Sequence, residues 1–192
     1  MSTPVLHLLA GSNGAGKSTF ADALLIPRTH LPFVSADLIA ARLWPEDRAE
    51  QARRAPEVSQ LAAEERERLM ASSVSFIAET VFSHPSKLDL LRRARGLGYT
   101  VWLHVIMVPE GLAVERVADR VAAGGHTDPE DKVRGRYARL WQLVGQARDL
   151  ADRADFYDNS SLDAPFRRIA VYEYGHVVGR PDWPTWAPDA LL

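Results

Sequence analysis

Residues 5–19 read VLHLLAGSNGAGKST, and this stretch decides the fold. Its first six residues form an apolar run that is typical of a buried strand, and residues 20–25 favour a helix. Between them, residues 11–18 fit the pattern of glycine, four residues, glycine, lysine, then serine or threonine. Glycines let backbone N–H groups turn inward, and the start of a helix adds partial positive charge, so such a loop cradles phosphates. A chance glycine-rich turn is the alternative, and the flanking strand and helix argue against it.

The loop predicts a nucleotide site with Mg²⁺ as its metal. Lys17 supplies a mobile positive charge for the β- and γ-phosphates of ATP or GTP, and the Ser18 hydroxyl is a ligand for Mg²⁺. The residues predicted to bind the nucleotide are Gly11, Asn13, Gly14, Ala15, Gly16, Lys17, Ser18 and Thr19.

Length and composition favour one domain over residues 1–192. The net charge of −2 argues against a nucleic-acid partner held by bulk electrostatics, and the absence of cysteine excludes disulfides and thiolate metal sites. No apolar run reaches membrane-spanning length and no signal segment opens the chain, so we expect a cytoplasmic protein with no membrane partner. Within the domain, we expect a lid region at about 110–140 and a packed C-terminal tail at 180–192, where tryptophans recur.

Strand and helix patterns alternate, which predicts an α/β fold with a mostly parallel sheet and helices on both faces. The expected strands are 5–10, 31–35, 73–78, 99–108, 155–160 and 167–174. The expected helices are 20 to near 27, 38–43, 57–72, 87–95, 109–123 and 130–154, with Pro56 as a break, Ser86 as an N-cap and 124–129 as a hinge.

Two acidic residues are expected at strand tips. Asp37 follows the second strand and Glu79 ends the third, and this edge of an open parallel sheet carries its sites. In a kinase, Asp37 would accept a proton from the acceptor hydroxyl, and Glu79 would hold either the acceptor or a Mg²⁺-bound water. A plain N-cap role explains Asp37 equally well. His104, inside the strongest strand, is expected to be a core histidine with a hydrogen-bond partner.

Arginines gather on both sides of the expected hinge. Arg116 and Arg120 precede it, and Arg134 and Arg136 follow it, as the arginines of a lid would. Each one alone is explained as a solvated surface residue. Since no apolar run ends in Asp-Glu, the water-activating pattern of motor-type ATPases is missing, which favours a small kinase.

Several motifs together resemble the zeta toxin family, over about residues 4 to 174. They are the loop 11–19, Ser35-Ala36-Asp37-Leu38-Ile39-Ala40, Glu79-Thr80-Val81-Phe82-Ser83, Gly98-Tyr99-Thr100-Val101, Arg116-Val117-Ala118-Asp119-Arg120-Val121, Gly124-Gly125-His126, Arg136-Tyr137 and Tyr157-Asp158-Asn159-Ser160. The resemblance implies a P-loop kinase fold with an arginine-bearing helical lid and transfer of phosphate from ATP or GTP to the sugar 3′-hydroxyl of UDP-N-acetylglucosamine. It also suggests an antitoxin protein as partner, which no residue pattern in the chain indicates.

The resemblance implies a role for each site residue. Lys17 and Ser18 contact nucleotide and metal, and Asp37 is the catalytic base. Glu79 and Thr80 lie at the acceptor site, and residues 158–160 lie near the nucleotide base. Lid arginines contact the transferred phosphate: Arg120, Arg134 and Arg136 are expected in catalysis and Arg116 in substrate binding.

Three functions remain open from the sequence. The first is an ATP-dependent phosphotransferase acting on a small-molecule hydroxyl, such as that of a nucleotide sugar, with Asp37 as base. The second is an NTPase or nucleotide-dependent switch in which Asp37 only caps a helix. The third is a polynucleotide kinase, which the near-neutral charge argues against.

Overall fold

A seven-stranded, mostly parallel sheet forms the centre of the computed structural model, which describes residues 3–122 and 130–192 without the side chains of residues 120–122 and 132. The strand order is β2-β3-β1-β4-β5-β6-β7. The first five strands in this order are parallel, and β6 runs antiparallel to both of its neighbours, β5 and β7. The expected hinge at 124–129 lies outside the described residues.

The elements follow one another in the order that the sequence predicts for an α/β fold. The strands are β1 Val5–Ala10, β2 Phe33–Val34, β3 Phe76–Thr80, β4 Thr100–Met107, β5 Arg153–Asp158, β6 Arg167–Glu173 and β7 His176–Val177. The helices are α1 Lys17–Phe20, a π-helical turn η1 Ala21–Leu25, α2 Ile26–Thr29, α3 Ala36–Leu43, α4 Arg48–Arg53, α5 Ala55–Ala71, α6 Ser86–Gly96, α7 Glu110–Ala122, α8 Glu130–Leu150 and a 3₁₀ turn η2 Asp189–Leu191.

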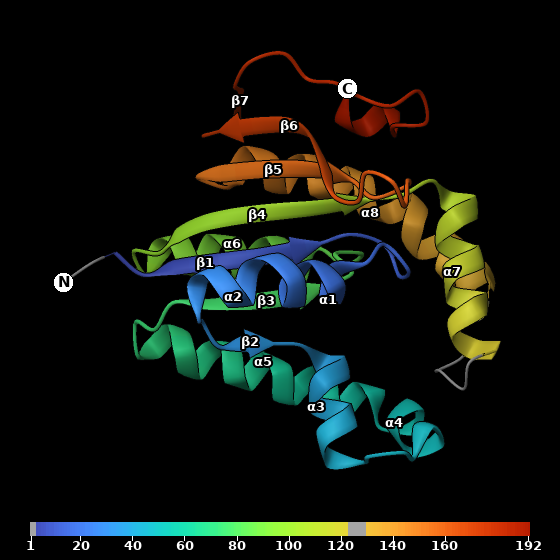
Figure 1. Cartoon of the computed structure of the whole chain (residues 1–192). Coiled ribbons are helices and arrows are strands. Elements are labelled where there is room, and N and C mark those ends of the chain that lie inside the picture. The colour runs from blue at the N-terminus through green and yellow to red at the C-terminus, as the bar shows by residue number, and fades with distance from the viewer. Residues whose placement is uncertain (1–2, 123–129) are drawn as a thin grey trace.

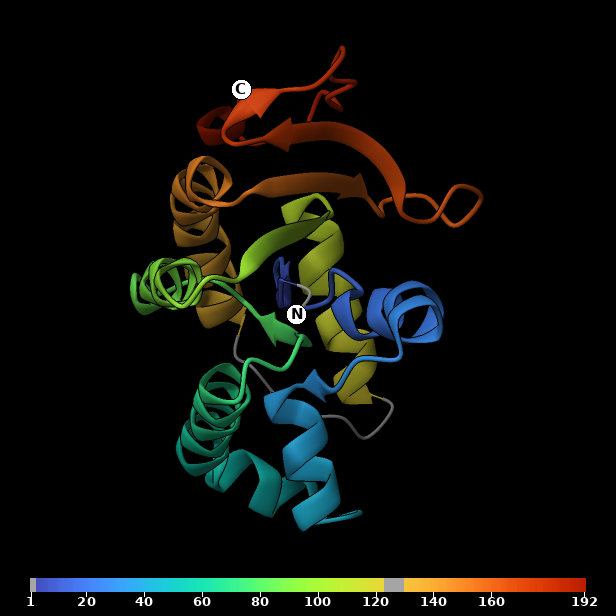
Figure 2. The same ribbon diagram turned by 90° about the vertical axis from the view of Figure 1, so that its left-hand side faces the viewer.

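Helices cover both faces of the sheet, as expected. Helices α1 and α2 lie on one face, and α6 and α8 lie on the other (Figures 1 and 2). Helices α3, α4 and α5 form a lobe beside the edge strand β2 (Figure 1). The core is dominated by β1 and β4, where Leu8 and Leu103 are fully buried, because a central parallel strand is covered on both sides.

The buried histidine of β4 has the partner that the sequence predicts. His104 is 1% exposed, and its Nε2 lies 3.0 Å from Nδ1 of His7 on the neighbouring strand β1. At the C-terminus, Trp183 and Trp186 pack against the core and Leu191 is buried. Within the described part of the chain, no helix combines the length and the apolar character needed to cross a membrane.

Two prolines lie inside helices, although a helix was predicted to end near Pro27 and Pro56 was predicted to mark a break before a helix. The helix after the phosphate loop continues through Pro27 to Thr29, because the π-helical turn η1 precedes it and Pro27 falls in the first turn of α2. Pro56 likewise stands in the first turn of α5, where its missing N–H leaves no hydrogen bond unmade. In the sequence alone, a proline in the first turn of a helix cannot be told from one that interrupts or ends a helix.

Other boundaries also differ from prediction. The third strand begins at Phe76 rather than 73, since Ser73 adopts a left-handed turn with φ 51°. Helix α8 ends at Leu150, and the next strand starts at Arg153. Ser86 is the first residue of α6 and not its N-cap, and its hydroxyl lies 2.9 Å from His84 Nδ1. Helix α4 and strand β7 were not predicted.

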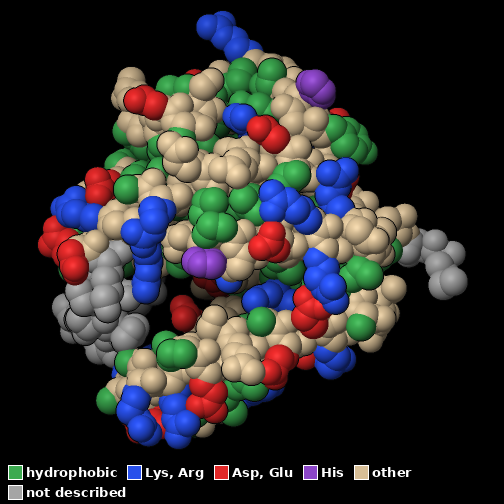
Figure 3. Space-filling model, turned by 180° about the vertical axis from the view of Figure 1, so that it is seen from behind, with side chains coloured by type: hydrophobic (Ala, Val, Ile, Leu, Met, Phe, Trp, Pro, Cys, Tyr) green, Lys and Arg blue, Asp and Glu red, His purple; other side chains and the backbone are tan. Residues whose placement is uncertain are grey.

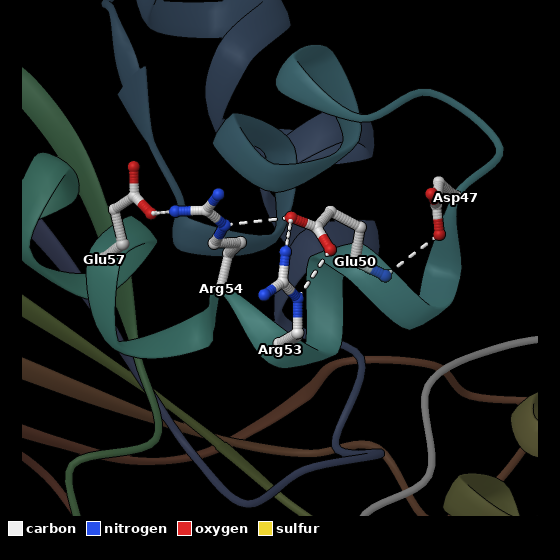
Figure 4. A network of polar contacts seen from close by, with 5 residues as sticks. All are labelled: Asp47, Glu50, Arg53, Arg54 and Glu57. Carbon is white, nitrogen blue, oxygen red and sulfur yellow. Dashed lines mark hydrogen bonds and ion pairs between the residues drawn. The ribbon is translucent and has the colours of Figure 1, made fainter.

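An ion-pair network joins α4 to the start of α5 (Figure 4). Glu50 binds Arg53 at 2.7 Å and Arg54 at 2.9 Å, and Arg54 also reaches Glu57 at 2.7 Å. Hydrogen bonds from the two arginines lower the pKa of Glu50 to about 2, and Arg53 has the larger effect. Asp47 caps α4 by accepting a hydrogen bond from the Glu50 N–H. The network fixes the direction in which α5 leaves α4.

Candidate active site

The phosphate loop between β1 and α1 has a backbone that only glycine adopts readily. Gly14 has φ 76° and Gly16 has φ 94°, both in the left-handed region. A Cβ on Gly14 would lie 2.8 Å from the Ala113 carbonyl oxygen, and one on Gly16 would lie 2.6 Å from Nδ2 of Asn159. Both glycines are thus required by conformation and by space.

Asn159, at the tip of β5, braces this loop. Its Nδ2 donates a hydrogen bond of 2.9 Å to the Ala15 carbonyl oxygen, and its own N–H donates to the Met107 carbonyl oxygen at the end of β4. The amide side chain is 8% exposed, so this contact is shielded from water. The resemblance places residues 158–160 near the nucleotide base, whereas the structure joins Asn159 to the phosphate loop itself.

Three polar side chains meet at the start of α1. Lys17 Nζ donates to the Ser12 carbonyl oxygen at 2.9 Å and lies 3.7 Å from Glu79 Oε1. The Ser18 hydroxyl donates to Glu79 Oε2 at 3.0 Å. Glu79 was expected to hold either the acceptor or a Mg²⁺-bound water, and the structure places its carboxylate directly on the two residues that the sequence assigns to phosphate and metal.

These residues fit both a nucleotide and Mg²⁺. The Ser12 hydroxyl oxygen is buried and has no hydrogen-bond partner among the described residues, which leaves a polar group available inside the cradle. Ser18 and Glu79 present oxygen donors side by side, the ligand type that Mg²⁺ prefers. Residues 3–122 and 130–192 contain no cluster of three or more His, Cys, Asp or Glu that could hold a metal, so phosphate oxygens would have to complete such a site.

A cavity of about 560 Å³ opens from the phosphate loop towards α3, α5 and the β3–α6 loop. Figure 3 shows this side of the molecule, hollowed between the body of the sheet and the lobe of α3, α4 and α5. The loop wall includes Lys17 and Thr19, and the far wall includes Asp37 and Thr80. The cavity thus brings together most of the residues that the sequence predicts for donor and acceptor, whereas Gly11, Ala15 and Arg116 do not line it.

Asp37 lies in the first turn of α3, directly after β2. It is one residue inside the helix, and Ser35 occupies the N-cap, so the alternative N-cap role for Asp37 is not observed. Its carboxylate is exposed in the cavity, and within the described residues it makes no hydrogen bond or ion pair. A carboxylate in this position is able to accept a proton from a bound molecule.

The far wall is built by α5 and by the strained loop after β3. Ala55, Ser59, Ala62 and Arg66 recur at helical spacing on the side of α5 that faces the cavity. In the loop, buried Phe82 adopts φ 62°, and its N–H donates to the Thr80 hydroxyl at 3.2 Å. A non-glycine residue in this conformation is costly and is often found at functional sites.

The arginines expected in the lid separate into different places. Arg136, on α8, lines the cavity. Arg116, on α7, has its Cβ beside Gly14 of the phosphate loop rather than at the acceptor wall. Arg134 points elsewhere, to Glu130 at 2.8 Å and Glu110 at 3.4 Å, and does not line the cavity. The side chain of Arg120 lies outside the described residues.

Two basic residues of the cavity were missed by sequence reasoning. Arg66 lies within the charged run of α5, and Lys87 lies in the first turn of α6. Helical spacing from Ala55 through Ser59 and Ala62 to Arg66 is the signal that could have found the first. No pattern in the sequence singles out Lys87.

Comparison with known proteins places the chain in a family. A model described as "AAA domain" (AAA_33) matches residues 6–143, so the chain belongs to that family. No curated protein matches the sequence.

Three solved structures share the fold. A chain solved with the AvrRxo1-ORF1:-ORF2 complex with ATP has a TM-score of 0.70 at 18% identity over 92% of this chain, which spans 60% of that one. A chain of the PezAT toxin-antitoxin system of Streptococcus pneumoniae has a TM-score of 0.63 at 13% identity, covering 89% of this chain and 72% of its own. A gluconokinase from Sinorhizobium meliloti has a TM-score of 0.50 at 20% identity, covering 82% of this chain and 84% of its own. The fold is therefore that of P-loop kinases.

Proposed function

We propose that this member of the AAA domain family is a phosphotransferase that moves the γ-phosphate of ATP to a hydroxyl group of a small molecule. The observation that carries the proposal is the cavity itself. Lys17 and Ser18 lie on one wall, the carboxylate of Asp37, which has no partner among the described residues, lies on another, and the space between them is large enough for an acceptor.

The residues of the loop wall bind the nucleotide. The backbone of the loop and Lys17 hold the β- and γ-phosphates, so Lys17 leaves the Ser12 carbonyl oxygen that it contacts in the free protein. Ser18 and Glu79 would hold Mg²⁺, which neutralises developing charge when bound. Glu79 thus belongs to the donor side in this proposal.

The chemistry requires one proton acceptor. Asp37 takes the proton of the acceptor hydroxyl as that oxygen forms its bond to the γ-phosphorus, and the bond from phosphorus to the bridging oxygen of ADP breaks. Arg136 lies at the cavity, where its guanidinium would stabilise charge on the transferred group. Thr80, beside Glu79, would contact the acceptor.

The resemblance to zeta toxins indicates which acceptor to test first. We propose UDP-N-acetylglucosamine as that acceptor, and the fold shared with a chain of a toxin-antitoxin system supports the choice. An antitoxin-like protein partner is part of the same proposal.

Transfer of radiolabelled γ-phosphate from ATP tests the function. The acceptors to supply are nucleotide sugars, free sugars and oligonucleotides. Asp37→Asn should keep ATP binding and lose about 10²–10⁴-fold in transfer, the range expected for a general base. Asp22→Asn, which removes an exposed carboxylate outside the cavity, is the matched control and should leave transfer unchanged.

Each alternative has its own outcome. Undiminished transfer in Asp37→Asn would refute the assignment of the base. Phosphate release at the same rate with and without every acceptor would favour an NTPase or switch, and transfer to oligonucleotides alone would favour a polynucleotide kinase.

A further inference from the structure

Arg66 and Lys87 place two positive charges on the acceptor side of the cavity. Arg66 projects from α5, in line with Ser59 and Ala62, and Lys87 stands in the first turn of α6, just after the β3–α6 loop. Both side chains are half-buried. Neither makes a hydrogen bond or ion pair with any residue in the part of the chain that the structure describes.

Partial burial without a partner is unfavourable for both cations. Burial lowers the pKa of Arg66. The pKa of Lys87 is lowered mainly by burial and, to a smaller extent, by repulsion from Arg66. Most basic side chains of these two helices are placed differently. Arg68 binds Glu65 at 2.6 Å, and Arg92 binds Asp89 at 2.9 Å, both at the exposed surface.

The carboxylates nearby are already engaged. Glu67, next to Arg66 in sequence, binds Arg93 at 2.7 Å. In the cavity, Glu79 holds Ser18 and Lys17. Asp37 is the remaining carboxylate of the cavity, and the proposed function uses it as a base.

The charge balance of the cavity differs from that of the whole chain. Among the residues whose side chains the structure describes, four cations line it, which are Lys17, Arg66, Lys87 and Arg136, against the two carboxylates Asp37 and Glu79. The chain as a whole has a net charge of −2. A local excess of positive charge in a cavity favours an anionic ligand.

We propose that Arg66 and Lys87 form an anion subsite that selects acceptors carrying a phosphate or carboxylate group in addition to the hydroxyl that is phosphorylated. The inference rests on the proposed function. Guanidinium and ammonium groups bind such anions through charge-assisted hydrogen bonds. An anion here would also relieve the repulsion between the two cations.

Position assigns the subsite to the acceptor rather than to the nucleotide. The phosphate loop is held by β1 and, through Asn159, by β5. Arg66 and Lys87 belong to helices that flank β3, on the side of the site where Asp37 follows β2. The two cations therefore come from the same segment of the chain as Asp37 and line the same cavity.

A binding measurement tests the subsite without relying on catalysis. The protein is first saturated with Mg²⁺ and a non-hydrolysable ATP analogue, which fills the phosphate loop, and then titrated calorimetrically with inorganic phosphate and with acetate, which bind Mg²⁺ only weakly. We expect one further anion site. Its affinity should fall at least tenfold in Arg66→Gln/Lys87→Gln, and Arg66→Lys should retain most of it because the charge is kept.

The matched control is Arg68→Gln/Arg92→Gln, which removes the same charges from the same two helices outside the cavity. It should leave the second anion site unchanged. Absence of a second site in the loaded protein, or equal loss in the control, would overturn the proposal. An equal loss of affinity for the ATP analogue in Arg66→Gln/Lys87→Gln would also overturn it, because the cations would then serve the nucleotide.

Transfer assays separate this inference from the proposed function. Acceptors are supplied as pairs that differ only in the anion, for example ribose with ribose 5-phosphate, glycerol with glycerate, and N-acetylglucosamine with its 1-phosphate. The anionic member should be preferred at least tenfold in kcat/KM, with the phosphate and carboxylate pairs identifying the group recognised. A second anion site without any phosphate transfer would refute the kinase and leave the subsite standing, whereas transfer without preference for the anionic member would refute the subsite alone.

Discussion

Substitution of Gly16 by alanine should cost stability through one identifiable contact. Its φ of 94° lies in the left-handed region, where a side chain costs about 1–2 kcal/mol. The new Cβ would lie 2.6 Å from Nδ2 of Asn159, so the amide must move and give up its hydrogen bond to the Ala15 carbonyl oxygen. A lost hydrogen bond of this kind costs about 1 kcal/mol. The expected total is roughly 2–3 kcal/mol, which corresponds to about 4–12 °C in Tm for a chain of this size.

A double-mutant cycle separates the two contributions. Asn159→Ala alone should lose the hydrogen bond and its roughly 1 kcal/mol. In Gly16→Ala/Asn159→Ala the clash is gone and the hydrogen bond is lost only once, so the double variant should be more stable than the sum of the single effects by about 1 kcal/mol. Urea unfolding of the four proteins gives this coupling energy.

Gly96→Ala is the control for glycine substitution as such. No atom lies within 4 Å of a Cβ at Gly96, its φ is not positive, and it ends helix α6. This variant should be neutral or slightly stabilising. Full additivity of Gly16→Ala and Asn159→Ala, or an unchanged Tm in Gly16→Ala, would show that Asn159 does not brace the loop.

Three further outcomes follow from the core and the site. Burial lowers the pKa of His7. Burial is also the main reason that the pKa of His104 lies well below 6.5, and repulsion from His7 adds to it. The free energy of unfolding should therefore be highest above pH 6.5 and fall below it, because the unfolded chain takes up protons that the folded chain does not. Urea unfolding between pH 7.5 and 5.5 should show a loss of up to about 1.4 kcal/mol per pH unit for each histidine, and an unchanged midpoint would contradict it. Leu103→Ala should cost about 2–5 kcal/mol in the same assay with ATP affinity unaffected at low temperature, because Leu103 is fully buried away from the cavity. Glu79→Gln should raise the Mg²⁺ concentration needed for half-maximal transfer about tenfold, since it removes a carboxylate beside Ser18, and an unchanged Mg²⁺ dependence would place the metal elsewhere.

Local signals predicted most of the fold. The phosphate loop, the buried strand β4 and the alternation of strands and helices each depend on spacing within a few residues, and all three are confirmed. Pro27 and Pro56 misled the prediction because a proline in the first turn of a helix and one after its end look alike in sequence. The π-helical turn before Pro27 depends on packing that no local pattern shows.

The site was harder to predict, because helix orientation decides which charged residues reach it. Arg134 and Arg136 are two residues apart on α8, and only Arg136 lines the cavity. Arg66 and Arg68 differ in the same way on α5, within a run of charges that reads as a solvated face. Glu79 was predicted at its strand tip, but its contact with Ser18 depends on the register between β1 and β3.

The two walls of the cavity come from separate parts of the chain. Asp37, Arg66, Glu79 and Lys87 all lie within one continuous segment, from β2 to α6. The brace formed by Asn159 holds the nucleotide loop from outside that segment. Under the proposed function, acceptor preference can therefore change through substitutions in this one segment, provided that Glu79, which belongs to the nucleotide side, is kept.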